Sequence, residues 1–181
     1  LAVIRRLLGD SLPAIRILPS LALAATVFVT GIITRRLGGT RWAIVIASLA
    51  VVAMPAYLVM GSFYSMNAFE IVLVAIILYL TILMLNEENP RYWVAIGALM
   101  GLGLEFKHTM VVYAIALVLG LFLAPSRRLL WNKWFVWGIV CSFLLLLPNL
   151  VWQLLHGFPS LEFYRNAMVN KNIPKDLFGI L

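Results

Sequence analysis

Long apolar runs, separated by short polar connections, alternate along the whole chain. The clearest runs cover residues 13–34, 42–63, 68–85 and 134–152. Each is close to the roughly 20 apolar residues with which a helix crosses the hydrocarbon core of a bilayer. Ser11 and Pro13 are typical of the start of the first helix, and Pro55 predicts a kink in the second. The pattern therefore predicts several transmembrane helices.

Two further apolar segments are shorter, and a charged stretch separates them. Residues 93–104 and 110–123 provide only 12 and 14 positions, with Glu105-Phe106-Lys107-His108-Thr109 between them. Neither segment is long enough to span a bilayer comfortably. Two interpretations remain open: one long broken hydrophobic segment that contains the charges, or two short helices that meet at a turn below the membrane surface.

The composition supports a membrane protein over a soluble one. Hydrophobic residues make up 64% of the 181 positions and charged residues 12%, against about 45–50% and about 25% in soluble domains. We expect an all-α polytopic transmembrane helix bundle: a single transmembrane domain over residues 1–181, with about five to six membrane helices and a short polar C-terminal segment. The chain starts at Leu1 and lacks a clean signal peptide after Arg5 and Arg6, so we interpret it as part of a longer protein.

The formal net charge of +7 comes from basic residues that lie between the apolar runs. A nucleic-acid partner is not expected, because these residues do not form one dense basic stripe. If the segments alternate across the membrane, one side collects half of the 14 Lys and Arg residues, and the positive-inside rule makes that side cytoplasmic. These residues are Arg35, Arg36, Arg41, Arg91, Arg127, Arg128 and Lys133. The same alternation gathers four polar clusters on the opposite face, at residues 9–11, 64–67, 105–109 and 156–160.

Ionisable side chains near membrane depth are the main candidates for function. Lys107 could offer an ammonium group to a phosphate, with Glu105 or His108 holding it in place, or the three could simply reach water at the interface. Asn67 and Glu70 are spaced for one helix face. They could bind a ligand, or Asn67 could cap the third helix with Glu70 at its N3 position.

Other candidates have equally plain alternatives. Arg16 lies about one turn inside the first run, where it could snorkel to the head groups or bind a lipid phosphate. His156 precedes a Gly and an aromatic-Pro turn, which is more typical of a solvated loop than of a metal ligand. The single Cys141 lies in an apolar stretch and gives no indication of a redox role. The glycines at 97, 101 and 103 favour close helix packing over a phosphate loop.

Five short motifs occur in a characteristic order. They are Gly9-Asp10-Ser11 with Ala14-Ile15-Arg16, Arg35-Arg36-Leu37-Gly38-Gly39, Ser65-Met66-Asn67-Ala68-Phe69-Glu70, Gly101 to Thr109, and Pro148-Asn149-Leu150-Val151-Trp152 with His156-Gly157-Phe158-Pro159-Ser160. In this order the chain resembles the prokaryotic membrane glycosyltransferases of family 39 type, which belong to the GT-C class and are related to the protein O-mannosyltransferases and the lipid A aminoarabinose transferase. Many relatives carry Asp where this chain has Asn67.

The resemblance implies inverting transfer of a sugar from a polyprenyl-phosphate donor to a protein or lipid acceptor, on the extracytoplasmic side of the inner (plasma) membrane. It places the catalytic carboxylate before Leu1, since Asp10 does not match that motif, so the chain alone is expected to be inactive. Lys107, Arg16 and His108 are then candidates for the donor phosphate, and Asn67, Glu70, Glu105 and His156 for the substrate or acceptor. No metal ligand is assigned, although some relatives use a divalent ion.

A multi-pass transporter or flippase for a lipid-linked substrate is the main alternative, because broken helices and intramembrane charges occur there as well. A transporter more often shows an internal repeat, and the two halves of this chain show no convincing one. A third interpretation is a membrane scaffold without catalytic activity.

Overall fold

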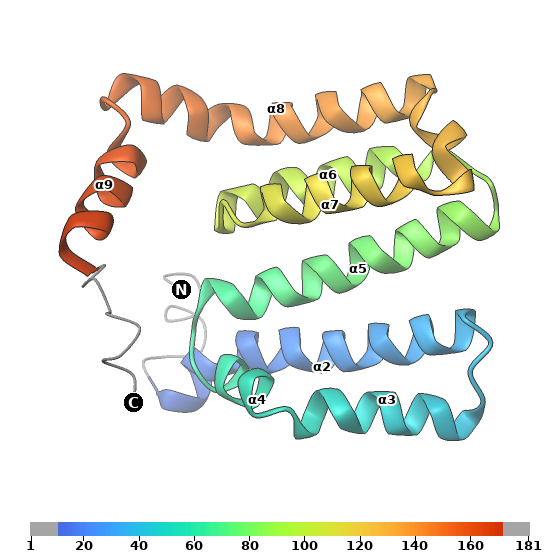
Figure 1. Cartoon of the computed structure of the whole chain (residues 1–181). Helices are drawn as coiled ribbons and strands as arrows, with labels where there is room; N and C mark the ends of the chain where they lie inside the picture. Colours follow the sequence, from blue (N-terminus) through green and yellow to red (C-terminus); the bar gives the residue numbers. More distant parts are fainter. Residues whose placement is uncertain (1–10, 172–181) are drawn as a thin grey trace, which may run out of the picture. The chain divides into compact units, whose positions relative to one another are not determined.

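The computed structural model describes residues 11–171, and these residues form helices without any strand. The helices are α2 (Leu12–Arg36), α3 (Arg41–Ala53), α4 (Pro55–Ser62), α5 (Met66–Asn86), α6 (Tyr92–Phe106), α7 (Met110–Leu123), a short 3₁₀ helix η1 (Pro125–Leu130), α8 (Lys133–Leu155) and α9 (Pro159–Lys171) (Figure 1). The predicted all-α class is confirmed. The chain divides into two compact units, with the boundary after Leu145 in α8, and each unit is described by itself.

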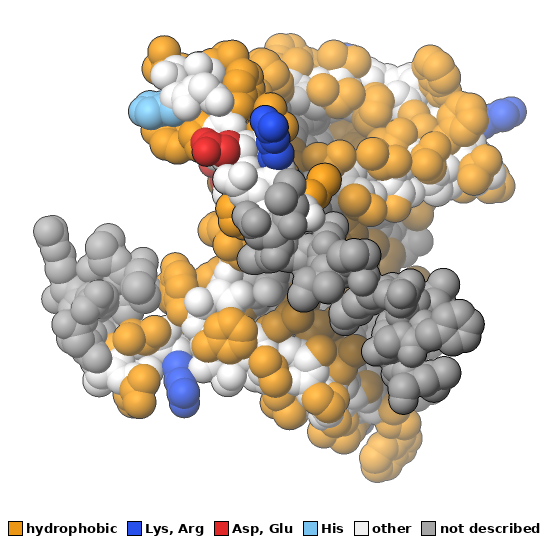
Figure 2. Space-filling view, turned by 60° about the vertical axis from the view of Figure 1, so that its left-hand side comes forward, with side chains coloured by type: hydrophobic (Ala, Val, Ile, Leu, Met, Phe, Trp, Pro, Cys, Tyr) orange, Lys and Arg blue, Asp and Glu red, His pale blue; other side chains and the backbone are white. Residues whose placement is uncertain are grey.

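Within residues 11–171, three helices are long and apolar enough to cross a membrane, namely α2, α5 and α8. The bent pair α3 and α4 would form a fourth span, while α6 and α7 are shorter. Only 22% of the apolar window of α2 and 33% of that of α5 are buried. Hydrophobic side chains accordingly dominate the face in Figure 2. A lipid environment explains this exposure, which confirms a membrane helix bundle.

Proline breaks the second apolar run, as expected, and does so completely. Helix α3 ends at Ala53, α4 begins at Pro55, and the two are bent by 61°. Met54 between them has an extended backbone (φ −72°, ψ 115°), the conformation favoured for a residue before proline. The predicted kink is therefore confirmed as a break between two helices.

In the first unit, α2 packs against α3, α4 and α5, and α5 packs against α6. Helices α6 and α7 form a hairpin whose turn lies at residues 107–109 (Figure 1). The Trp93 indole nitrogen donates to the Leu129 carbonyl at 2.7 Å, which ties the start of α6 to the segment before α8. The buried apolar core of this unit comes from α5, α6, α7 and η1, and comprises Ile77, Met84, Trp93, Ile96, Met100, Met110, Leu121, Leu129 and Leu130.

The second unit contains a helix where the sequence predicted only a polar segment. Helix α9 follows a tight turn in which Gly157 (φ +72°) and Phe158 (φ +60°) have left-handed backbones. The buried Gln153 side chain accepts the Ser160 backbone N–H at 3.3 Å and donates to the Ser160 hydroxyl. These two hydrogen bonds fix the start of α9. Nothing in the sequence indicated that Gln153, in the preceding helix, would cap it. Arg5, Arg6, Gly9, Asp10, Lys175 and Asp176 lie outside the described residues.

Candidate functional site

Helix lengths place Lys107 beside the first turns of α5. A short turn joins α5 to α6, so the two helices run in opposite directions from it (Figure 1). At 1.5 Å per residue, the part of α5 from Glu70 to the turn is about 23 Å long, and so is the part of α6 from the turn to Lys107. Helix α6 ends at Phe106 because Lys107 adopts an extended backbone, with φ −161° and ψ 130°. The hairpin therefore ends level with Glu70, about one turn inside the start of α5.

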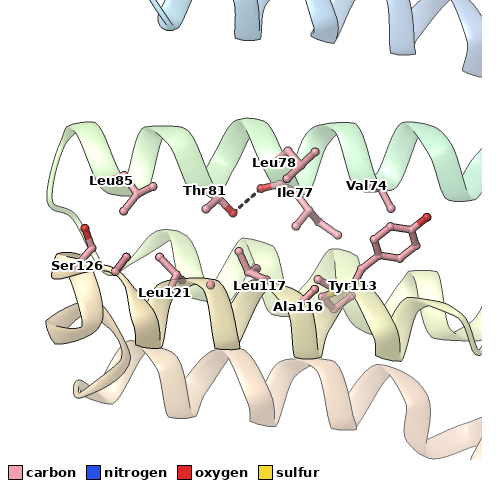
Figure 3. A pocket seen from close by; sticks show the side chains of 13 residues that line it. Val74, Ile77, Leu78, Thr81, Leu85, Tyr113, Ala116, Leu117, Leu121 and Ser126 are labelled. Carbon is pink, nitrogen blue, oxygen red and sulfur yellow. Dashed lines mark hydrogen bonds between the residues drawn. The ribbon is translucent and has the colours of Figure 1, made fainter.

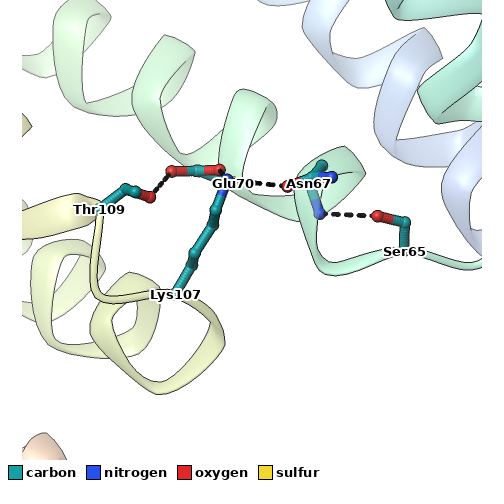
Figure 4. Close-up of polar contacts among 5 residues, drawn as sticks. All are labelled: Ser65, Asn67, Glu70, Lys107 and Thr109. Carbon is teal, nitrogen blue, oxygen red and sulfur yellow. Dashed lines mark hydrogen bonds and ion pairs between the residues drawn. The ribbon is translucent and has the colours of Figure 1, made fainter. Parts of the chain in front are cut away.

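The Lys107 ammonium group binds two side chains of α5. Its Nζ lies 2.9 Å from Asn67 Oδ1 and 2.9 Å from Glu70 Oε2 (Figure 4). The other carboxylate oxygen of Glu70 accepts the Thr109 hydroxyl. The Glu70 side chain is 9% exposed and that of Lys107 is 35% exposed. An ammonium group has three N–H donors, and no other described residue takes the third, so it is available to a ligand.

A cap on α5 explains why both Asn67 and Glu70 are free to reach Lys107. The Ser65 hydroxyl accepts the Asn67 backbone N–H at 3.2 Å, which makes Ser65 the N-cap of α5. The alternative in which Asn67 caps this helix, with Glu70 at N3, is wrong. Because Ser65 satisfies the helix start, the Asn67 side chain stays available, and the spacing of three puts it on the same face as Glu70.

A polar cavity of about 330 Å³ surrounds these groups. Its walls come from α4, α5, α7 and the hairpin turn, and its lining residues are Tyr57, Met60, Asn67, Glu70, Ile71, Lys107, Thr109 and Tyr113. Sequence reasoning did not assign Tyr57, Thr109 or Tyr113 to a site. The spacing of four between Thr109 and Tyr113 was a signal, since it puts both on one side of α7.

A second cavity, of about 440 Å³, runs along α5 and α7 (Figure 3). Its lining is almost entirely apolar, and it extends from Val74 and Tyr113 at one end to Leu85 and Ser126 at the other. Residues 74–85 of α5 cover about 17 Å, which is more than half of a hydrocarbon core about 30 Å thick. Tyr113 lines both cavities, so the apolar cavity begins where the polar one ends.

The other candidate residues do not line the polar cavity. Glu105 and His108 are exposed near the hairpin turn, and Arg16 is exposed on α2 and lines neither cavity. His156 belongs to the second unit, where its ring stacks on Trp152 with centroids 4.6 Å apart and its Nδ1 lies 2.8 Å from the Trp152 carbonyl oxygen. Within residues 11–171, no three His, Cys, Asp or Glu side chains are grouped as metal ligands.

Basic side chains gather at the other end of the first unit. Arg128 forms an ion pair with Glu88, which joins η1 to the turn after α5. The guanidinium of Arg91 and the ammonium of Lys133 each lie 5.5 Å from the centre of the Trp134 ring. The turns that carry these residues are therefore neighbours, as the alternation of the segments predicted.

One family model matches the chain, over residues 1–152, and its description is dolichyl-phosphate-mannose-protein mannosyltransferase. The matched region includes Asn67, Glu70 and Lys107 and stops before His156. No significant match was found among curated proteins or among solved structures. The match covers most of the chain and agrees with a bundle of apolar helices, so the chain belongs to the dolichyl-phosphate-mannose-protein mannosyltransferase family, a family of membrane glycosyltransferases.

Proposed function

We propose that this protein transfers a sugar from a polyprenyl-phosphate donor to an extracytoplasmic protein or lipid acceptor, with inversion at the anomeric carbon, as in the prokaryotic enzymes of family 39 type. The observation that carries the proposal is the Lys107 ammonium, held by Asn67 and Glu70 at the wall of a polar cavity. Family membership supports a glycosyltransferase, and the cavity supplies a place for the donor phosphate.

The chemistry needs a fixed positive charge at the leaving group. When the bond between sugar and phosphate breaks, negative charge grows on the phosphate, and a pre-oriented donor lowers the barrier by stabilising that charge. Lys107 supplies this charge through its third N–H. Glu70 acts as a positioning residue, because both of its oxygens are engaged by Lys107 and Thr109. Asn67 lines the same cavity and serves the sugar or the acceptor in this proposal.

The apolar cavity suits the lipid part of the same donor. It starts at Tyr113, beside the polar cavity, and continues between α5 and α7 toward the opposite end of the unit. A polyprenyl chain that enters at Tyr113 would bury its first isoprene units against Val74, Ile77 and Leu117 (Figure 3). Such burial is favourable at about 25 cal/mol per Å² when the alternative is water. In a membrane its main effect is to orient the phosphate toward Lys107.

Charge distribution supports the orientation. Arg91, Arg128 and Lys133 lie together at one end of the first unit, and the positive-inside rule makes that end cytoplasmic. The Lys107 cavity, at the far end of α5 and α6, then faces the extracytoplasmic side of the inner membrane. In this proposal the polyprenyl-phosphate sugar reaches Lys107 from the extracytoplasmic side.

Donor turnover in the full-length protein tests the proposal. At limiting polyprenyl-phosphate sugar, Lys107→Ala should lower kcat/KM by about a hundredfold, the usual cost of removing one donor to a developing anion. Lys133→Ala removes the same side chain at the opposite end and should leave turnover unchanged. Equal amounts of folded protein are verified by size-exclusion chromatography. If turnover with Lys107→Ala equals that of the wild type at limiting donor, Lys107 is not part of the site.

A further inference from the structure

A third cavity lies at the basic end of the first unit, between α2 and α5. Its volume is about 560 Å³, and it is lined by Ile32, Arg35, Arg36 and Tyr79. The two arginines are the last residues of α2, while Tyr79 lies about two turns before the end of α5. Two guanidinium groups and a phenol ring therefore line one cavity where two membrane helices meet.

Neither Arg35 nor Arg36 forms an ion pair with an acidic side chain among residues 11–171. Arg128 is paired with Glu88, and Arg91 and Lys133 lie over the Trp134 ring. The acidic residues in the turn after α5 are used elsewhere, since Glu88 binds Arg128 and Glu87 accepts the Tyr92 hydroxyl at 2.7 Å. The cavity thus holds two positive charges that no acidic side chain of residues 11–171 contacts directly.

The geometry favours a phosphate group as the counter-ion of Arg35 and Arg36. A guanidinium is planar and matches phosphate oxygens with two parallel N–H donors, and Tyr79 adds a hydroxyl to the lining. Ile32 gives the cavity an apolar wall on α2, a helix long and apolar enough to cross a membrane. Basic cavities between transmembrane helices at the cytoplasmic end are typical binding sites for anionic head groups.

We propose that the Arg35–Arg36–Tyr79 cavity binds the phosphate of an anionic phospholipid from the leaflet around this end of the protein. This site lies at the opposite end of the first unit from Lys107 and does not depend on the sugar-transfer reaction. The lipid phosphate would neutralise the charges of Arg35 and Arg36 at the end of α2. Through its contact with Tyr79 it would also stabilise the packing of α2 against α5. It is a structural ligand with no covalent step.

Lipid binding to the full-length protein in mild detergent, without sugar donor, tests this site. The melting temperature is measured while phosphatidylglycerol is added, with phosphatidylcholine and inorganic phosphate as comparison ligands. The wild type should be stabilised by phosphatidylglycerol more than by either comparison. Arg35→Gln combined with Arg36→Gln should weaken the apparent affinity for phosphatidylglycerol about tenfold or more.

The matched control is Arg41→Gln combined with Arg127→Gln, which removes the same charge from the same end but leaves the cavity lining intact. It should keep the wild-type response. If loss of the two charges prevents membrane insertion, Arg35→Lys with Arg36→Lys keeps the charge but loses the planar donors, and a severalfold weaker affinity is still expected. An unchanged affinity in the cavity variant, an equal loss in the control, or an equal response to inorganic phosphate would each overturn the proposal.

Discussion

Gly97 of α6 and Gly138 of α8 are in backbone contact. A Cβ atom added to Gly97 would lie 2.0 Å from the carbonyl oxygen of Gly138, and one added to Gly138 would lie 2.4 Å from the carbonyl oxygen of Trp93. One turn further along, a Cβ on Gly101 would lie 2.7 Å from the Ser142 carbonyl oxygen. Membrane helices pack this closely only where side chains are small. These contacts hold the hairpin of α6 and α7, and with it Lys107, against the start of α8.

Gly97→Ala should therefore destabilise the protein by about 2 kcal/mol or more, because the added methyl group meets backbone that cannot rotate away. Gly120→Ala is the matched control, since nothing lies within 4 Å of its added Cβ. That change should be neutral or slightly stabilising, because alanine is the better helix former. The free energy of unfolding in detergent, measured for both variants, gives the comparison. Equal stability of the two variants would contradict the close packing of α6 on α8.

The cap on α5 gives a second prediction. Ser65→Ala should cost about 1 kcal/mol of unfolding free energy, because the Asn67 backbone N–H loses its acceptor. Ser65→Asp should keep most of that stability. Ser62→Ala, which removes an exposed hydroxyl bonded to Val59 within α4, should change little. A Ser65→Ala variant as stable as Ser62→Ala would show that another group caps α5.

The two ion pairs found among residues 11–145 should differ in strength. Glu70→Gln should lower the unfolding free energy by about 1–2 kcal/mol. The Glu70 side chain is only 9% exposed, and its replacement leaves the Lys107 ammonium without its counter-charge. Glu88→Gln removes the partner of Arg128 in a pair whose side chains are 65% and 68% exposed, and it should cost less than about 1 kcal/mol. Urea titration of both variants measures the difference. The reverse order would show that Glu70 and Lys107 are not paired within the membrane protein.

The apolar cavity can be tested by filling it. Ala116→Phe places a ring inside the lining between α5 and α7, so the KM for a long-chain polyprenyl-phosphate sugar should rise severalfold. The KM for a donor with a much shorter isoprenoid chain should change less. Ile115→Phe adds bulk on a neighbouring exposed position outside the lining and should leave both values unchanged. Equal effects on short and long donors would exclude this cavity as the chain site.

The apolar runs, a kink at Pro55 and a turn between the two short segments could be predicted from the sequence, because hydrophobic pattern and proline are local signals. The hairpin interpretation of 93–123 was one of two alternatives, and the structure selects it. The start of α9 could not be predicted, since it depends on a side-chain contact from Gln153 across a turn. Helix existence is thus a local property, while helix starts depend on contacts between turns.

The site was predicted in part. Asn67, Glu70 and Lys107 were each identified as candidates, but the sequence suggested Glu105 or His108 as the groups that hold Lys107. In the structure its ammonium binds Asn67 and Glu70, 40 and 37 positions away. That pairing depends on the similar distances of Glu70 and Lys107 from the turn that joins α5 and α6, and on Ser65 rather than Asn67 capping α5. Neither follows from residue types alone.

Binding of the lipid phosphate tests the central claim most directly. The affinities of the full-length wild type and of Lys107→Ala are measured for polyprenyl phosphate and for the matching polyprenol, which lacks the phosphate. The account predicts that Lys107→Ala binds polyprenyl phosphate about tenfold or more weakly, the loss of one charge-assisted hydrogen bond, and binds polyprenol as the wild type does. Equal affinity of the two proteins for polyprenyl phosphate would contradict it.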